Sequence, residues 1–82
     1  MRRISFSRSF LKDYRKLSKD IRDNLGDKLK LLLGNPRHPS LRLKKMGNTA
    51  YWEISITMNY RLILRLESDE IFLVAAGTHD LL

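Results

Sequence analysis

The sequence contains no cysteine, only two prolines and four glycines, and no long apolar run. Without cysteine, neither a disulfide framework nor a thiolate zinc site can hold the chain together, so its stability has to come from packing. A membrane-spanning helix needs about 20 consecutive apolar residues, and the basic N-terminal stretch MRRISFSRSF has no apolar segment of signal-peptide length. We therefore expect a cytoplasmic protein with no membrane partner.

Acidic residues are also scarce. Nine Asp and Glu against sixteen Lys and Arg leave a net charge of +7 on 82 residues. Such an excess creates a surface field that attracts phosphate-rich polymers or an acidic protein, although a basic face that is merely solvated is the alternative. With 43% hydrophobic residues the chain has a globular composition, and its length allows one core, so residues 1–82 are expected to form a single domain.

Two helices are predicted near the N-terminus, after a short edge strand in RRISFS, where Ile4 and Phe6 share one side. The first helix follows a cap at Ser7 or Ser9, and the second follows a cap at Ser18. The second helix should continue through Gly26 and stop at the segment Leu33 to Pro36. Its apolar face contains Ile21, Leu25, Leu29 and Leu32, and that of the first contains Phe10, Tyr14 and Leu17.

An irregular connection is expected from Gly34 to Ala50, because it holds both prolines and two of the four glycines, with a short extended piece at Leu41 to Leu43. Three alternating segments follow, YWEISIT, YRLILRLE and EIFLVAAG, which predict an antiparallel meander. The sequence thus predicts an α+β domain in the order βααβββ, with a two-helix hairpin packed on a small antiparallel sheet.

Side-chain alternation predicts which residues face each other in this meander. A three-residue loop at Met58, Asn59 and Tyr60 makes one face of the first pair wholly apolar, whereas a two-residue loop would mix the faces. On the apolar face this register pairs Ile56 with Leu62, Ile54 with Leu64 and Trp52 with Leu66. On the other it pairs Thr57 with Arg61, Ser55 with Ile63 and Glu53 with Arg65.

The third strand extends this pattern. Ile71, Leu73 and Ala75 are predicted on the apolar face, and Phe72, Val74 and Ala76 opposite Arg65, Ile63 and Arg61. Because the helices can cover only the apolar face, the polar face is left free, with small Ala76 beside Arg61. We expect a functional site on that face, and we expect Trp52 to belong to the core.

The order of these elements, together with two motifs, resembles the RelE/ParE superfamily of bacterial toxin–antitoxin systems. The motifs are the aromatic-arginine step Tyr60-Arg61 and the closing GTHDLL, and the run from His38 to Leu64 is similar to the branch of RelE-type toxins or plasmid-stabilisation proteins. The resemblance covers nearly the whole chain. It implies a microbial ribonuclease-like fold, whose enzymatic members cleave messenger RNA in the ribosomal A site without a metal.

Such cleavage requires a proton acceptor, a cation and a proton donor, because the ribose 2′-hydroxyl attacks the adjacent phosphate. Arg61 matches the family's arginine, and its guanidinium can hold two phosphate oxygens. His79 falls where enzymatic members carry arginine or histidine, and its imidazole gains and loses a proton near neutral pH. Glu53 is the candidate general base. Here the chain departs from the family, since well-studied enzymes have lysines at the positions of Glu53 and Ser55.

Several other basic residues are candidates for RNA binding. Lys44 and Lys45 precede the meander and would add salt-sensitive affinity for phosphate, and Lys12 and Arg15 on the first helix could bind ribosomal RNA, as could their neighbours Arg8, Lys16, Lys19 and Arg22. Arg65 is a further candidate, although an ion pair is its alternative. Arg61 could likewise form a surface pair with Glu53, and His79 could be a terminal histidine bound to backbone.

Three functions remain compatible with the sequence: an mRNA endoribonuclease, a ParE-like inhibitor of DNA gyrase without enzymatic activity, and a degenerate toxin that only binds its antitoxin. The resemblance implies a cognate antitoxin, the ribosome and mRNA as partners, with an acidic or amphipathic antitoxin covering the basic surface and the Phe72 and Val74 patch. Free monomer and homodimer are both compatible. Two separated histidines do not make a metal site, and no cofactor motif is present.

Overall fold

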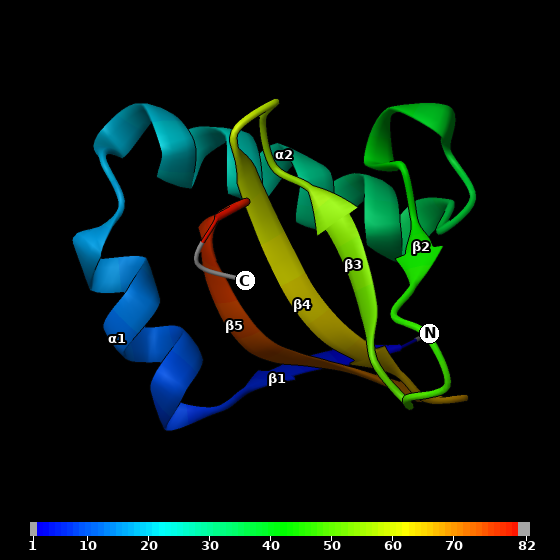
Figure 1. Cartoon of the computed structure of the whole chain (residues 1–82). Helices are drawn as coiled ribbons and strands as arrows, with labels where there is room; N and C mark the ends of the chain where they lie inside the picture. Colours follow the sequence, from blue (N-terminus) through cyan, green and yellow to red (C-terminus); the bar gives the residue numbers. More distant parts are fainter. Residues whose placement is uncertain (1, 81–82) are drawn as a thin grey trace.

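Five strands form one sheet in the order β1-β5-β4-β3-β2, with α2 packed behind it and α1 beside β5 (Figure 1). The computed structural model describes residues 2–80. The strands are β1 Arg3–Phe6, β2 Lys44–Lys45, β3 Trp52–Ser55, β4 Tyr60–Leu66 and β5 Glu70–Thr78, and the helices are α1 Arg8–Lys16, α2 Lys19–Gly34 and a 3-10 turn η1 Pro39–Leu41. The predicted α+β fold and the meander are confirmed. None of the helices within residues 2–80 has the length and hydropathy to cross a membrane.

Both helices begin at the predicted serines. The hydroxyl of Ser7 accepts a 3.0 Å hydrogen bond from the N–H of Phe10, and that of Ser18 accepts one of 3.3 Å from Ile21. α2 runs through Gly26 without a break, as predicted, and ends at Gly34. The caps therefore place the hairpin where the sequence indicates.

The core lies between the helices and one face of the sheet. Its buried members come from α1, α2, η1 and the strands: Phe10, Leu17, Leu25, Leu32, Leu41, Ile54, Ile56, Leu62, Leu64, Ile71, Leu73 and Ala76. Burial of each large aliphatic or aromatic side chain contributes about 1.5 to 3 kcal/mol, which is enough to fix the helices on this face. Trp52 packs against the cluster, so its assignment to the core is confirmed.

The connection before β3 differs from the prediction. Leu41 to Leu43 is not extended, because η1 forms instead and the short strand β2 follows at Lys44–Lys45. The 3-10 turn starts where the imidazole Nδ1 of His38 accepts a hydrogen bond from the N–H of Ser40. Its last residue, Leu41, is fully buried and anchors the turn in the core.

Two features of the edge strands lay beyond the sequence prediction. β1 is an edge strand, as expected, but it runs parallel to β5, with Ile4 opposite Ile71. β2 adds a fifth strand on the other edge. The sheet is therefore mixed, with one parallel pair.

The predicted register between β3 and β4 is wrong by two residues. Ser55 lies opposite Arg61 and Ile54 opposite Leu62, so the pairs that involve Thr57 with Arg61 and Glu53 with Arg65 do not form. The Tyr60 carbonyl accepts hydrogen bonds from Ile56 and Thr57, which closes the turn one residue earlier than expected. A slip of two residues leaves each side chain on its predicted face.

A bulge interrupts the pairing of β4 with β5. Arg65 lies opposite Phe72, as predicted, but the register shifts between Leu64 and Ile63, so that Ile63 faces Ala75 and Val74 is the extra residue. The predicted positions of Val74, Ala75 and Ala76 are therefore wrong. Ala76 is buried in the core, 5% exposed, and Gly77 lies opposite Arg61.

Side chains of α1 and of its N-cap bond to the backbone of β5 at the bulge. β1 ends at Phe6, so the outer edge of β5 has no strand partner beyond Leu73. The Ser7 hydroxyl donates a 2.7 Å hydrogen bond to the Val74 carbonyl, and the Ala76 N–H donates one of 3.0 Å to a carboxylate oxygen of Asp13. These bonds satisfy backbone groups that a regular ladder would otherwise pair.

Candidate active site

Arg61 and His79 line one hollow at the strand ends of the sheet, between the β3–β4 turn and the end of β5. The hollow has a volume of about 490 Å³ and is lined by Met58, Asn59, Tyr60, Arg61, Thr78, His79 and Asp80. Uninterrupted alternation from Leu73 would direct His79 to the helix-covered face. The bulge reverses the alternation and brings His79 to the side of Arg61.

Arg61 is held by the turn that precedes it. Its Nη1 donates hydrogen bonds to the carbonyls of Thr57 at 2.9 Å, Met58 at 2.7 Å and Tyr60 at 3.2 Å. Its Nε and Nη2 make no hydrogen bond within residues 2–80. A guanidinium has five N–H donors in a planar fork, so the Nε and Nη2 edge remains available for two oxygens of a phosphate.

His79 is held through its main chain. Its N–H donates a 2.9 Å hydrogen bond to the carbonyl of Asn59, while the exposed imidazole makes no hydrogen bond to the described part of the chain. The hydrogen bond to backbone that the sequence left open for His79 is thus made by its main chain. His79 therefore lines the hollow beside Arg61 with a main-chain anchor.

Glu53 lies on the same face but outside the hollow. It pairs with Ile63 on β4 and with Lys44 on β2, while Ser55 occupies the position opposite Arg61. Diagonal neighbours on one sheet face are about 7 to 8 Å apart, so Glu53 is one diagonal step from Arg61. No ion pair joins Glu53 to an arginine among residues 2–80.

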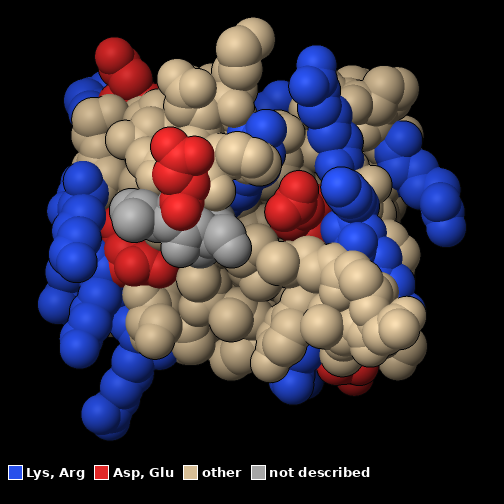
Figure 2. Space-filling view, in the orientation of Figure 1, with Lys and Arg blue, Asp and Glu red and all other residues tan. Residues whose placement is uncertain are grey.

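The two lysines of β2 point to opposite sides of the sheet. Lys44 lies opposite Glu53 on the polar face, and Lys45 lies opposite Trp52. Both are exposed. Figure 2 shows the basic side chains in two main groups, one over α1 at the left and one over η1 and β2 at the right. Only the second group adjoins the polar face of β3.

The remaining basic candidates differ in their contacts. The Arg65 guanidinium lies 5.0 Å from the ring centre of Phe72, and its Nε is 3.8 Å from a carboxylate oxygen of Glu67. Arg65 thus has the ion pair that was the alternative to RNA binding, with Glu67 as its partner. Lys12 and Arg15 are exposed on α1, and no ion pair involves them within residues 2–80. Of the predicted RNA-binding residues, none lines the hollow.

Arg22 has a structural role. Its Nε donates to the carbonyl of Tyr14 at 3.2 Å and its Nη2 to that of Arg15 at 3.0 Å, which caps the C-terminal end of α1. Its guanidinium also lies 5.1 Å from the ring centre of Tyr14. These contacts give Arg22 a helix-capping role, and its binding of ribosomal RNA stays a prediction.

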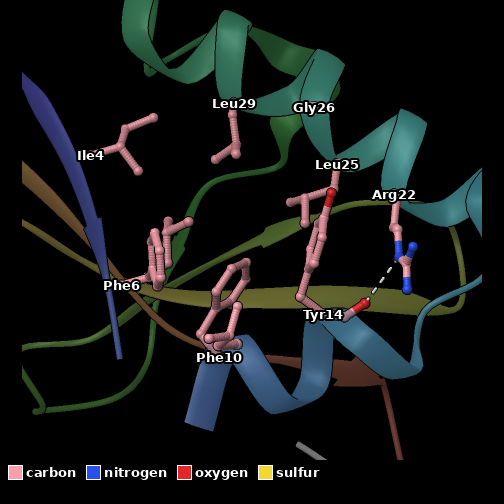
Figure 3. A pocket seen from close by; sticks show the side chains of 10 residues that line it. Ile4, Phe6, Phe10, Tyr14, Arg22, Leu25, Gly26 and Leu29 are labelled. Atoms are coloured by element: carbon pink, nitrogen blue, oxygen red, sulfur yellow. Dashed lines mark hydrogen bonds between the residues drawn. The ribbon is translucent and has the colours of Figure 1, made fainter. Parts of the chain in front are cut away.

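An apolar groove opens between α1, α2 and β1 (Figure 3). It has a volume of about 260 Å³, and Phe6 in its wall is 54% exposed. Gly26 lies along it, and a Cβ built there would have no atom within 4 Å. Its other lining residues are Ile4, Phe10, Leu11, Tyr14, Arg22, Leu25, Leu29 and Leu73.

Sequence reasoning missed two contributors to the site. Asp13 holds the bulge that reorients His79, and Asn59 receives the His79 N–H through its main-chain carbonyl. The Asn59 contact has no sequence signal, because any residue supplies a carbonyl. Asp13 was detectable only as an acidic residue in an otherwise basic helix. No cluster of three or more potential metal ligands occurs among residues 2–80.

The fold is that of a RelE-like toxin. The chain is similar to the YafQ toxin in the E. coli DinJ–YafQ complex, with 24% identity, a TM-score of 0.82 and coverage of 100% of this chain and 98% of that one. It is similar to RelE in the intact E. coli RelBE complex, with 26% identity, a TM-score of 0.77 and coverage of 95% and 96%. The YoeB dimer from Staphylococcus aureus matches with 21% identity, a TM-score of 0.76 and coverage of 95% and 97%.

The sequence comparison assigns the family. Residues 4–80 match the model for the ParE toxin of type II toxin–antitoxin systems, parDE, and the chain therefore belongs to this toxin family within the RelE/ParE superfamily. A search of curated proteins returned no match.

Proposed function

We propose that this chain is the toxin of a type II toxin–antitoxin system and acts as a metal-independent endoribonuclease on ribosome-bound messenger RNA. The observation that carries the proposal is the shared hollow of Arg61 and His79 at the ends of β4 and β5. A protein that only binds a partner does not require a cation and a free imidazole around one cavity.

The reaction transfers the phosphate within the RNA. The 2′-hydroxyl loses its proton and its oxygen attacks the adjacent phosphorus, the bond to the 5′-oxygen breaks, and that oxygen takes up a proton. Negative charge develops on the phosphate oxygens, where the free edge of Arg61 would stabilise it. His79 in its protonated form would give the proton to the leaving 5′-oxygen.

The remaining role is that of the base. Glu53 is the carboxylate on the same face that is within one diagonal step of Arg61. It would accept the 2′-hydroxyl proton in place of the lysines that well-studied family enzymes use. Ser55, directly opposite Arg61, has no charge and leaves room for the ribose.

Primer extension on translating ribosomes tests the proposal. Wild-type protein should cut the message within the A-site codon, whereas Arg61→Ala and His79→Ala should leave it whole. An intact message with wild-type protein, together with a loss of gyrase supercoiling, would instead assign the non-enzymatic function. The family model, which is that of ParE toxins, is the specific observation in favour of this second candidate.

We further propose that a helix of the cognate antitoxin binds in the apolar groove between α1, α2 and β1. A glycine inside a helix costs about 1 kcal/mol relative to alanine, and the chain's own packing does not require one at Gly26. The backbone of a partner helix that packs closely against α2 would require glycine at this position. The exposed basic residues of α1 flank the groove, so an amphipathic helix with acidic residues on its outer side matches both its apolar walls and its charge.

A further inference from the structure

A second hollow, with two basic residues in its wall, adjoins the one that contains Arg61 and His79. It has a volume of about 210 Å³ and is lined by Lys28 of α2, by Ser40 and Arg42 near η1, and by Ser55, Ile56, Thr57 and Met58 at the end of β3. Met58 is 82% exposed and lines both hollows. The two cavities therefore meet at a single side chain on the β3–β4 turn.

The backbone of Arg42 is in a conformation that favours glycine. Its φ of 51° and ψ of 46° lie in the left-handed region, and it is the one non-glycine residue with positive φ among residues 2–80. The fold requires this conformation because it ends η1 directly after the buried Leu41, with the Arg42 N–H bonded to the Pro39 carbonyl. The packing does not require the exposed arginine side chain, which has no ion pair within the described residues.

Lys28 brings a second cation to the same hollow. Its Nζ donates a 3.2 Å hydrogen bond to the Ser40 carbonyl, which links α2 to the loop and fixes the ammonium at the wall. An ammonium has three donors, so two remain. Three hydroxyl-bearing residues, Ser40, Ser55 and Thr57, complete the lining, and no acidic residue is among its lining residues. Two cations with adjacent hydroxyls suit a phosphate group.

We propose that Lys28 and Arg42 bind a phosphate of the RNA strand that neighbours the reacting phosphate at Arg61. The strand crosses the β3–β4 turn, and Met58 contacts the nucleotide between the two sites. This assignment rests on the proposed function, and it extends the substrate from one reacting nucleotide to a longer segment of single-stranded RNA. Neither Lys28 nor Arg42 was among the residues that the sequence indicated.

Binding of short RNA measures this subsite separately from cleavage. The probes are fluorescein-labelled oligoribonucleotides of two to six residues with 2′-O-methyl riboses, which cannot react, titrated with the full chain at low ionic strength and followed by anisotropy. Arg42→Gly removes the cation and suits the left-handed backbone. This variant should bind the longer probes about tenfold more weakly than wild type and bind the dinucleotide with unchanged affinity. The slope of log K against log salt should fall in magnitude by about 0.7, as for one lost contact to single-stranded RNA.

Matched variants separate charge from structure. Lys28→Met should reproduce the length-dependent loss, whereas Lys30→Met, on the same helix but outside the hollow, should bind as wild type does. Arg42→Lys should keep most of the affinity. Equal affinity of wild type and Arg42→Gly for every probe would overturn the subsite while leaving Arg61-dependent cleavage intact. Failure of the wild-type protein to bind any probe would overturn the subsite, whereas the nuclease function is overturned only by an uncut message in the primer-extension assay on translating ribosomes.

Discussion

The main-chain N–H of His79 donates a 2.9 Å hydrogen bond to the carbonyl of Asn59 in the β3–β4 turn. The same turn accepts three hydrogen bonds from the guanidinium of Arg61. One short turn therefore fixes the positions of the two residues that we assign to the phosphate and to the leaving group. The predictions that follow treat this turn and its supports as one unit.

Arg61→Lys should abolish most of the cleavage although it keeps the positive charge. A lysine cannot bond the turn carbonyls and also present a two-donor edge to phosphate, so we expect a loss of about 10²-fold or more in single-turnover rate. Arg65→Lys is the matched control on the same strand and should cleave normally. Retention of full activity by Arg61→Lys would contradict a bidentate role.

His79→Gln should be inactive and as stable as wild type. Glutamine fills a similar space but cannot transfer a proton, and loss of a general acid lowers rates by about 10²- to 10⁴-fold. The hydrogen bond to Asn59 comes from the main chain, so urea unfolding should not change. An RNA with a better leaving group at the 5′-position should restore much of the rate if His79 is the acid, and none if it only binds.

Glu53→Gln tests the base. It removes the carboxylate while preserving size and polarity on β3, and we expect cleavage to fall by about 10²-fold with RNA binding unchanged. Because an acidic side chain repels phosphate, slightly tighter binding is also compatible with the role. The measurements are single-turnover cleavage and anisotropy with a 2′-O-methyl RNA. An unchanged cleavage rate would remove Glu53 from the mechanism.

Asp13→Ala should destabilise the protein and reduce cleavage from a distance. It removes the acceptor of the Ala76 N–H, and an unpaired buried donor costs about 1 to 3 kcal/mol. Asp13→Asn retains an acceptor oxygen and should therefore lose less stability and less cleavage activity than Asp13→Ala. Urea unfolding measures the stability of both variants. If Asp13→Ala lowers stability without changing the cleavage rate at a temperature where it stays folded, the bulge does not depend on Asp13.

Gly26→Ala and Gly26→Leu should separate folding from partner binding. Alanine should raise the free energy of unfolding by up to about 1 kcal/mol, since its Cβ enters open space. Leucine should fill the groove and weaken the complex with the cognate antitoxin. Thermal unfolding and calorimetric titration measure the two effects. Asp27→Leu, on the exposed side of α2, is the control and should bind the antitoxin normally.

Alternation predicted the faces of β3 and β4 correctly but not their register. A slip of two residues exchanges one apolar pair for another, so Ile54 meets Leu62 instead of Leu64 with the same burial. The hydrophobic pattern has no information that separates these registers. The hydrogen bonds of the turn to the Tyr60 carbonyl select the observed register. These bonds depend on the backbone geometry of the turn, which the residue types do not specify.

The bulge was not predictable for a related reason. The segment from Leu73 to Ala76 is apolar throughout, so it gives no sign of where alternation stops. The side chains that bond its backbone, Ser7 and Asp13, are more than sixty residues away in the chain. The sequence therefore indicated Arg61 and His79 through a family resemblance, while the reason they share a cavity lies in long-range contacts.

Because the bulge adds a single residue, the length of the segment between Leu73 and His79 matters more than its composition. Deletion of one residue there would leave a regular strand with its apolar character intact, yet it would invert every side chain that follows and send the imidazole into the helices. Homologous toxins should accordingly tolerate exchange among small apolar residues in this segment but not insertions or deletions that change its length. Such one-residue deletions offer a simple genetic route to folded, harmless alleles.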